Sequence, residues 1–283
     1  MRRRFQQVDV FSPVPFLGNP VAVVVDGEGL TTEEMARFSS WTNLSETTFL
    51  LPPTTPEADY RVRIFALARE LPFAGHPTLG SCHAWLAAGG VPRDAGRIVQ
   101  ECGAGRVPIR RTEHGLAFAA PLLLRTGPVD EALVRTLADV LGIARGEIVD
   151  ARWADNGPGW VAVLLKDADA VLAVEPDFGR WTGAGPLDLG IAGPYPPGSE
   201  CAWEVRAVFS DDQGAMREDP VTGSLNASLA QWLLESGRAT APYVASQGTR
   251  LDRRGRPRID RDADGTVWVG GPTHTCIQGE VEL

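Results

Sequence analysis

The sequence predicts an α/β protein made of two similar halves, and three observations support this prediction. The chain has 283 residues and is 43% hydrophobic, which is enough for two domains with buried cores. An alternating, β-branched strand pattern followed by a loop and an apolar-periodic helix occurs twice. The two copies are related by one offset of 143 positions without a gap, as from Val62 to Val205.

The repeat aligns identical residues across strand, loop and helix. The matched pairs are Val62-Arg63 with Val205-Arg206, Pro77 with Pro220, Gly80-Ser81 with Gly223-Ser224, and Leu86-Ala87 with Leu229-Ala230. A fainter match, at an offset of 140, sets Pro20-Val21-Ala22-Val23 beside Val161-Ala162-Val163. Two offsets this close indicate duplicated halves with a small insertion, and chance similarity between common strand–loop–helix units is the alternative.

Local patterns predict the elements of each half. The expected elements are a helix over 32–42, strands over 47–51 and 60–65, a helix over 79–88, a strand over 204–209 and a helix over 224–235. Gly89-Gly90 and Gly237 follow the two repeat helices and are expected to end them. Pro121 and Gly127-Pro128 break the pattern between the copies. The predicted domains are therefore 1–120 and 128–283, with the last strand able to pack back on the first half.

Composition excludes several classes of partner. The net charge is −9, from 36 acidic and 27 basic residues, and no stretch concentrates the basic residues into a run that would follow a phosphate backbone, so nucleic acid is not expected to bind. No apolar segment approaches the length of a membrane span or a signal core, so a cytoplasmic protein is expected. The four cysteines include no Cys-x-x-Cys pair, which favours reduced thiols over disulfides or a zinc site.

The sequence also predicts that no cofactor is needed. Lys166, the only lysine, ends a strand-like run, whereas a pyridoxal-phosphate enzyme needs a lysine for its Schiff base. Neither a phosphate-binding Gly-x-x-x-x-Gly-Lys loop nor a dinucleotide-binding Gly-x-Gly-x-x-Gly is present. His83, His114 and His274 are not spaced as metal ligands and are interpreted as structural, so no metal is expected. The chemistry must then come from side chains.

Glu46 and His76 are candidate catalytic residues in the first half. Glu46 joins the end of a predicted helix to a strand, where a carboxylate can project from a rigid strand end as a base. A solvated or capping glutamate is the alternative. His76 lies between Gly75 and Pro77 just before a helix N-terminus, where exposed N–H groups attract an anion such as a substrate carboxylate. A role for His76 as an N-terminal cap is the alternative.

Asp219 is the candidate in the second half, because the repeat places it where the first half has His76. If the halves are related by an approximate two-fold axis, an acid and a base could face one bound molecule from opposite sides. The alternative is a capping role, since Asp219-Pro220 is a favourable Ncap–N1 pair.

Several segments in one order make the chain resemble the phenazine-biosynthesis (PhzF-like) family over nearly its whole length. These segments are Gly18-Asn19-Pro20, Asn43-Leu44-Ser45-Glu46-Thr47, Glu70-Leu71-Pro72-Phe73-Ala74-Gly75-His76-Pro77-Thr78-Leu79-Gly80, Glu218-Asp219-Pro220-Val221-Thr222-Gly223-Ser224 and Gly270-Gly271. The resemblance implies a diaminopimelate-epimerase-like fold with two pseudo-symmetric domains. Each would be a curved, barrel-like sheet around a central helix, with the active site in the cleft between the domains.

The resemblance also implies an activity and a set of site residues. Glu46 would be the general acid/base of a cofactor-independent isomerase, assisted by His76 and Asp219. The predicted substrate contacts are Gly75, Ser224, Gly223 and Asn19. The founding activity moves a proton between ring carbons of a dihydro-hydroxyanthranilate, so the expected partner is a small carboxylate-bearing molecule. A homodimer is expected by resemblance.

Rival functions are an epimerase or racemase, a hydrolase or lyase, and a binding module without catalysis. Two-thiol racemases of this fold carry cysteines where this chain has His76 and Asp219, and Cys82 lies farther inside the helix. A hydrolase or lyase would pair His76 with Ser224, but the chain lacks a Gly-x-Ser-x-Gly elbow. The segment Ala66-Leu67-Ala68-Arg69 departs from the family pattern, so substrate specificity does not transfer with the motif.

Overall fold

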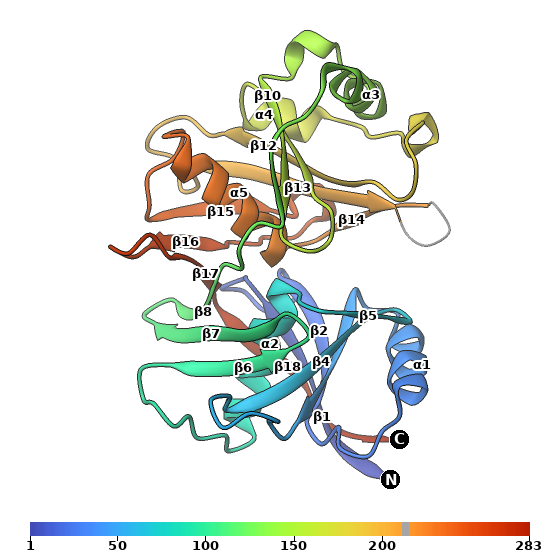
Figure 1. The fold of residues 1–283 in the computed structure, drawn as a ribbon, viewed down its shortest axis with the longest axis vertical. Coiled ribbons are helices and arrows are strands. Elements are labelled where there is room, and N and C mark those ends of the chain that lie inside the picture. The colour runs from blue at the N-terminus through green and yellow to red at the C-terminus, as the bar shows by residue number, and fades with distance from the viewer. Residues whose placement is uncertain (211–214) are drawn as a thin grey trace. The chain divides into compact units, whose positions relative to one another are not determined.

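The chain divides into two compact units. The computed structural model describes residues 1–210 and 215–283. The first unit contains Met1–Ala119 and Trp268–Leu283, and the second contains Ala120–Val267. The second unit is therefore one continuous segment inserted into the first (Figure 1).

The first unit is built from ten strands and two helices among the residues described. The strands are β1 (Arg2–Val10), β2 (Asn19–Val24), β3 (Glu46–Leu51), β4 (Tyr60–Ala66), β5 (Arg69–Leu71), β6 (Ile98–Cys102), β7 (Gly105–Thr112), β8 (Gly115–Ala119), β17 (Val267–Gly271), which begins at the unit boundary, and β18 (Thr273–Glu282). The helices are α1 (Thr32–Thr42) and α2 (Gly75–Ala87).

The second unit contains eight strands and three α-helices in its described part. The strands are β9 (Arg125–Pro128), β10 (Asp150–Asp155), β11 (Val161–Leu164), β12 (Asp188–Pro194), β13 (Trp203–Ser210), β14 (Met216–Asp219), β15 (Tyr243–Gln247) and β16 (Arg258–Arg261). The helices are α3 (Glu131–Leu141), α4 (Ala168–Ala173) and α5 (Gly223–Glu235), with short 3-10 turns at Arg145–Glu147, Phe178–Arg180 and Thr249–Leu251.

The predicted internal repeat is confirmed by strand pairing. In the first unit, β1 and β2 pair antiparallel, β2 and β3 parallel, β3 and β4 antiparallel, β4 and β5 antiparallel, β4 and β6 parallel, and β6 and β7 antiparallel. The second unit repeats this series with β10, β11, β12, β13, β14, β15 and β16. Helices α2 and α5 occupy the same place in both series, after the short strands β5 and β14. Both offsets in the sequence therefore reflect one duplicated α/β topology.

The predicted helices lie where the periodicity indicated, and the largest difference is at the start of α2. Helix α1 spans the predicted 32–42, and α5 begins one residue before its predicted start. Helix α2 begins at Gly75, four residues before its predicted start at residue 79, and includes Pro77 in its first turn. Proline is compatible with a first helical turn, because the N–H that it lacks has no intrahelical partner there.

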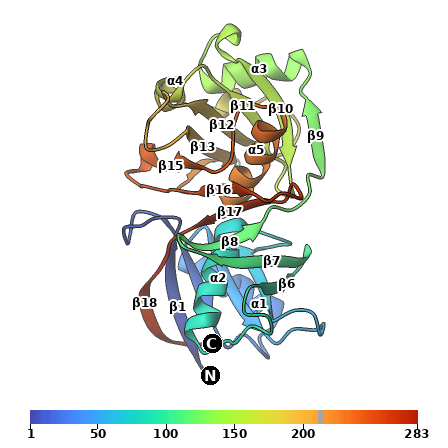
Figure 2. The same ribbon diagram turned by 90° about the vertical axis from the view of Figure 1, so that its left-hand side faces the viewer.

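Each repeat helix forms the centre of its unit. Helix α2 contacts β1, β2, β3, β4, β8 and β18, so strands surround it on several sides (Figure 2). Helix α5 packs its apolar side chains against Trp160, Trp203 and neighbouring small residues. In the first unit, Gly80 allows α2 to pack closely against β2, because a Cβ at this position would lie 2.3 Å from Val21 Cγ1. A helix enclosed by a sheet requires apolar residues around most of its circumference, and α2 and α5 have them.

Within the two described stretches of chain, no α-helix has the length and apolar character required to cross a lipid bilayer.

Candidate active site

Three elements of the first unit begin at one place and bring Asn19, Glu46 and His76 together. Strand β2 begins at Asn19, and strand β3 begins at Glu46. The two strands are parallel, with Val21 paired to Glu46, so their first residues lie at the same edge of the sheet. Asn43 ends α1 in the left-handed conformation, with φ 56°, and the chain then turns into β3. Helix α2 presents His76 in its first turn to the same edge.

The three side chains form a contact chain inside the first unit. His76 Nε2 lies 3.3 Å from Glu46 Oε2, an ion-pair distance without hydrogen-bond geometry. On the other side of the ring, Asn19 Nδ2 lies 3.2 Å from His76 Nδ1. The His76 side chain is 3% exposed and that of Glu46 is 17% exposed. The imidazole is thus buried, hydrogen-bonded at Nδ1 and in contact with the carboxylate at Nε2, whereas the carboxylate is partly exposed to solvent.

His76 is neutral at physiological pH. Burial lowers the pKa of His76 from 6.5 to about 3, and a hydrogen bond to the backbone of Pro20 opposes this effect only in part. A neutral imidazole offers one donor and one acceptor, so it can hold a polar group or relay a proton without carrying a charge.

The low pKa of His76 predicts a pH dependence of stability. Between about pH 3 and pH 6.5 the unfolded chain protonates this histidine and the folded chain does not. Unfolding therefore takes up a proton, and stability falls as the pH falls through this window, by up to about 1.4 kcal/mol per pH unit. We expect His76→Gln to flatten the curve of unfolding free energy against pH, measured by urea denaturation. His114→Gln removes an exposed histidine as the control. An unchanged slope in His76→Gln would contradict the prediction.

The second unit holds Asp219 in a separate buried network around Gln247. Thr222 Oγ1 donates to Asp219 Oδ2 over 2.5 Å, and Gln247 Nε2 donates to the Asp219 carbonyl and to Thr222 Oγ1. Gln247 Oε1 accepts from the Thr222 N–H at 3.0 Å and from Asn226 Nδ2 at 2.8 Å. Gln247 is completely buried, so one amide fixes the end of β14 and the start of α5 together.

Ser224 is held by two further side chains of the second unit. Trp160 Nε1 donates to Ser224 Oγ over 3.1 Å, and Asn156 Nδ2 donates to the Ser224 carbonyl over 2.8 Å. Ser224 is buried, at 6% exposure. Its hydroxyl proton is free to be donated, because the indole contact uses the oxygen as an acceptor.

Helices α2 and α5 differ from the other helices at their N-termini. Helices α1, α3 and α4 each have a side-chain N-cap, from Thr31, Asp130 and Asp167. The N-cap residues of α2 and α5 are Ala74 and Thr222, and neither makes a side-chain capping bond. Gly75 and Gly223 are the first residues of these helices, so their N–H groups lie where an anionic group binds well.

These caps decide between the alternatives left open by the sequence. His76 lies inside α2 and Asp219 lies in β14, three residues before the N-cap of α5, so neither is an N-cap. The capping interpretations of His76 and Asp219 are therefore wrong, because α2 starts at Gly75 after the N-cap Ala74, and α5 starts at Gly223 after the N-cap Thr222.

The sequence gives no signal that marks the residues supporting Asp219 and Ser224, which are Gln247, Trp160, Asn156 and Asn226. Gln247 ends a strand immediately before Gly248, and Trp160 follows the Gly157-Pro158-Gly159 turn. Polar residues at strand ends are common, and only the fold shows that these contact Asp219, Thr222 or Ser224.

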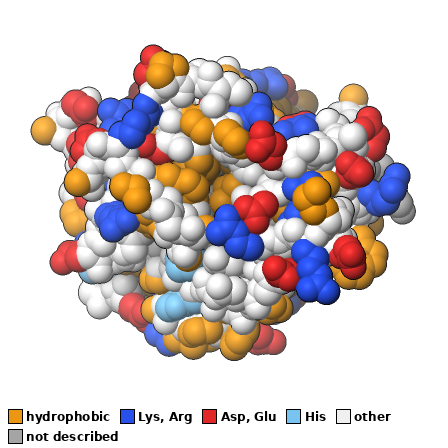
Figure 3. Space-filling model, turned by 90° about the horizontal axis from the view of Figure 1, so that it is seen from below, with side chains coloured by type: hydrophobic (Ala, Val, Ile, Leu, Met, Phe, Trp, Pro, Cys, Tyr) orange, Lys and Arg blue, Asp and Glu red, His pale blue; other side chains and the backbone are white. Residues whose placement is uncertain are grey.

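The remaining histidines have structural contacts or lie at the surface. His83 makes 2.8 Å contacts through Nδ1 and Nε2 with the hydroxyls of Thr273 and Thr275 on β18. His114 lies in an exposed turn. Histidine side chains reach the surface in Figure 3, where positive and negative side chains are interspersed over the face.

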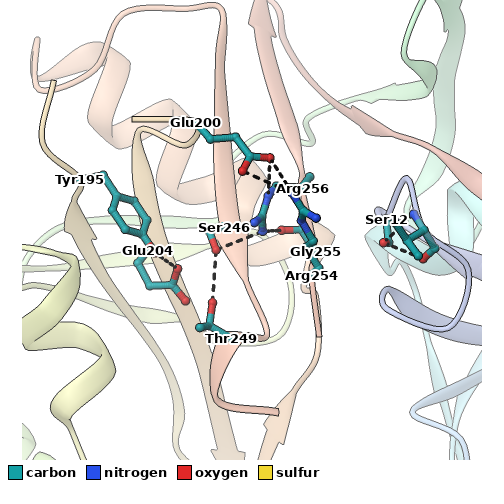
Figure 4. Close-up of polar contacts among 10 residues, drawn as sticks. Ser12, Tyr195, Glu200, Glu204, Ser246, Thr249, Arg254, Gly255 and Arg256 are labelled. Atoms are coloured by element: carbon teal, nitrogen blue, oxygen red, sulfur yellow. Dashed lines mark hydrogen bonds and ion pairs between the residues drawn. The ribbon is translucent and has the colours of Figure 1, made fainter. Parts of the chain in front are cut away.

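A second polar cluster in the second unit contains Tyr195, Glu200, Glu204, Ser246, Arg254 and Arg256 (Figure 4). The Tyr195 hydroxyl donates to Glu204 Oε2 over 2.7 Å. Burial, followed by the neighbouring Glu204 carboxylate, raises the pKa of Tyr195 to about 12. Arg256 Nη1 donates to Ser246 Oγ, and both Arg254 and Arg256 contact Glu200. This cluster joins β13, β15 and the segment before β16.

The four cysteines are free thiols, and Cys82 is buried inside α2. Burial raises the pKa of the Cys82 thiol to about 12, so it is a poor proton donor or acceptor near neutral pH. Among residues 1–210 and 215–283, no three His, Cys, Asp or Glu side chains gather as metal ligands. The candidate acid/base groups are thus carboxylates and one neutral imidazole.

Comparison with known proteins places the chain in a family. Residues 8–279 match the family model of phenazine biosynthesis-like proteins (PhzC-PhzF). The chain is 33% identical to antisense-enhancing sequence 1 of Schizosaccharomyces pombe, over 98% of this chain and 97% of that protein. It is 34% identical to trans-2,3-dihydro-3-hydroxyanthranilate isomerase of Pseudomonas aeruginosa, over 80% of this chain and 78% of that protein.

The fold agrees with this assignment. The crystal structure of a PhzF-family protein of Enterococcus faecalis superposes with a TM-score of 0.78 at 24% identity and covers 100% of both chains. Several relatives carry the name isomerase. The chain therefore belongs to the phenazine biosynthesis-like (PhzF) family and is an isomerase.

Proposed function

We propose that this isomerase shifts a proton within a small, unsaturated, carboxylate-bearing cyclic metabolite, with Glu46 as the acid/base group. Glu46 would remove a proton from an activated carbon, and the double bond would move. The same carboxyl would then return the proton to another carbon of the same molecule. The reaction has no net gain or loss of protons or electrons, so it needs no external oxidant or reductant.

The contact between Glu46 and His76 is the observation that carries this proposal. A carboxylate at a strand end, 17% exposed and 3.3 Å from a buried neutral imidazole, is accessible and yet fixed in position. Because the imidazole is neutral, it does not hold Glu46 in a permanent ion pair, and the carboxylate stays available as a base. The N–H group of Gly75 at the uncapped start of α2 is suited to a substrate carboxylate.

We propose that Asp219 and Ser224 act on the same substrate molecule as Glu46. Asp219 lies at a strand end and is held by Thr222, and Ser224 is the second residue of α5, with a hydroxyl that can donate. A double-mutant cycle between Glu46→Gln and Asp219→Asn tests this assignment. Residues acting in one reaction give strongly non-additive losses, whereas independent residues give additive ones.

Trans-2,3-dihydro-3-hydroxyanthranilate is the first substrate to test, because the Pseudomonas aeruginosa relative is named for it. We expect the purified protein to convert it in D2O and to incorporate deuterium at the newly protonated carbon, detected by NMR and mass spectrometry. Solvent deuterium enters because the Glu46 carboxyl, once it has taken the proton from carbon, exchanges that proton with solvent before it protonates the second carbon. An unchanged compound would exclude this substrate, and conversion at the full rate by Glu46→Gln would exclude the mechanism.

A further inference from the structure

Each unit contains a two-bond arginine–glutamate pair across the hairpin that precedes its central helix. In the second unit, Arg206 Nε and Nη2 donate to Glu218 over 3.0 and 2.8 Å. In the first unit, Arg63 Nε and Nη2 donate to Glu70 over 2.7 and 2.5 Å. The offset of the repeat places Arg63 on Arg206. Paired N–H donors on one carboxylate fix the relative orientation of two strands as well as their separation.

The register of the two hairpins is the same. Glu218 is paired with Val208, and Arg206 lies two residues before Val208 on the same strand face. In the first unit, Glu70 is paired with Phe65, and Arg63 lies two residues before it. The pair is therefore a duplicated feature of the fold and not an accident of side-chain packing in one unit.

The two pairs differ in burial and in their distance from the candidate site. Arg206 and Glu218 are 3% and 10% exposed, whereas Arg63 and Glu70 are 23% and 41% exposed. Glu218 immediately precedes Asp219, but Glu70 precedes His76 by six residues. Only the second-unit pair is both buried and adjacent to a candidate acid/base residue.

Arg206 is also anchored on its other side. Its Nη1 donates to the carbonyls of Val171 and Val174 over 3.1 and 2.6 Å, at the C-terminal end of α4. Burying a charged pair is costly unless all of its groups are hydrogen-bonded, and removing one partner leaves an uncompensated charge. Arg206, which lies on β13, therefore fixes the C-terminal end of α4 and strand β14 relative to β13.

We propose that Arg206 and Glu218 are positioning residues for Asp219 in the reaction proposed above, on which this inference rests. In the described part of the chain, β14 is paired antiparallel with β13, with Glu218 opposite Val208 and Asp219 opposite Ala207. Successive side chains of a strand point to opposite faces, so fixing Glu218 on one face sets the direction of Asp219 on the other. Gln247 holds the Asp219 carbonyl and the Arg206 pair holds the preceding residue, so the backbone is fixed on both sides of that side chain.

A neutral replacement of the whole pair separates positioning from stability. Arg206→Met combined with Glu218→Leu removes both charges, and such replacements often preserve or raise stability. We expect the double variant to remain folded and to melt above Glu218→Gln, with a loss relative to wild type from the Val171 and Val174 carbonyls, which no longer have the Arg206 donor. Its kcat for trans-2,3-dihydro-3-hydroxyanthranilate should fall by about 10- to 100-fold, the effect of an approximately 1 Å displacement of a reacting group. Glu218→Gln alone should lose both stability and rate.

The matched control is the pair Arg145 and Glu131 in the same unit. Arg145 Nε and Nη2 bind Glu131 over 3.0 and 2.9 Å, and Nη1 donates to the Ile148 carbonyl, but the pair is exposed and remote in sequence from Asp219. Arg145→Met combined with Glu131→Leu should leave kcat and KM unchanged.

If the wild-type protein does not convert trans-2,3-dihydro-3-hydroxyanthranilate, that result contradicts the proposed function for this substrate. The positioning of Asp219 is then tested by a second measurement that does not depend on turnover. The carboxyl of Asp219 is titrated by 13C NMR in wild type and in the neutral double variant. Loss of the nearby charges alone shifts this midpoint, so a change in the position of Asp219 is supported by a displaced midpoint together with loss of the hydrogen bond from Thr222 Oγ1 to Asp219 Oδ2. An Asp219 titration and a kcat that both match wild type in a stable double variant would overturn the proposal.

Discussion

Replacing Glu46 by Gln is expected to lower kcat by about 10²- to 10⁴-fold, the usual contribution of a general acid/base group. The amide keeps the size of the carboxyl group and its place at the start of β3, but it cannot take up a proton from carbon. KM should change little, because the proposed substrate contacts are other residues, namely Asn19, Gly75, Gly223 and Ser224. Steady-state rates on trans-2,3-dihydro-3-hydroxyanthranilate provide the measurement.

Glu57→Gln is the control for this substitution. Glu57 is an exposed glutamate of the first unit that contacts Arg106 at 3.4 Å, and exposed ion pairs contribute little to stability. Its variant should retain the wild-type rate. The melting temperature of Glu46→Gln should also remain close to wild type, so that a loss of rate is not a loss of fold. A Glu46→Gln protein that is folded and fully active would remove Glu46 from the mechanism.

Replacing Gln247 by Leu is expected to destabilise the second unit by about 3–6 kcal/mol. Gln247 is completely buried and makes four hydrogen bonds, to the Asp219 carbonyl, the Thr222 N–H and hydroxyl, and Asn226. Leucine fills a similar volume but leaves these groups without their partner, and each buried unsatisfied group costs about 1–3 kcal/mol. The melting temperature should fall by roughly 10 °C or more, measured by calorimetry or circular dichroism.

Gln231→Leu is the matched control, because Gln231 makes a single 2.8 Å bond to the Pro121 carbonyl from a partly buried position on α5. It should cost about 1 kcal/mol. If Gln247→Leu were no less stable than Gln231→Leu, the network around Asp219 would not be the stabilising element described above.

Much of the architecture can be predicted from the sequence, because the same local pattern occurs twice. The strand over 60–65 and the helix over 32–42 have clear periodicity, and their observed bounds differ from the expectation by one residue or less. Helix α2 is harder to delimit, since its first turn contains Gly75 and Pro77, residues that usually mark a loop. The pairing of β18 with β1 joins segments at opposite ends of the chain, and no local signal specifies it.

The candidate site is only partly accessible to sequence analysis. Glu46 and His76 are recognisable from unusual polar motifs, whereas Asn19 is implied only by the family resemblance. The first unit brings these three into contact. The supporting residues Gln247 and Trp160 are different, because each acts through a contact with a residue distant in sequence. Such a contact depends on the parallel pairing of β13 with β15 or on a turn beside α5, which residue spacing alone does not specify.

The insertion of the second unit into the first has a consequence for biosynthesis. Strand β1 is bordered by β2 on one side and by β18 on the other, and residues 268–283 emerge from the ribosome only after the entire second unit. The second unit can therefore complete its sheet while the first still lacks a border strand. During translation, the half that carries Glu46 and His76 would be the last to reach its final form, with the long edge of β1 exposed to other nascent chains until β18 covers it.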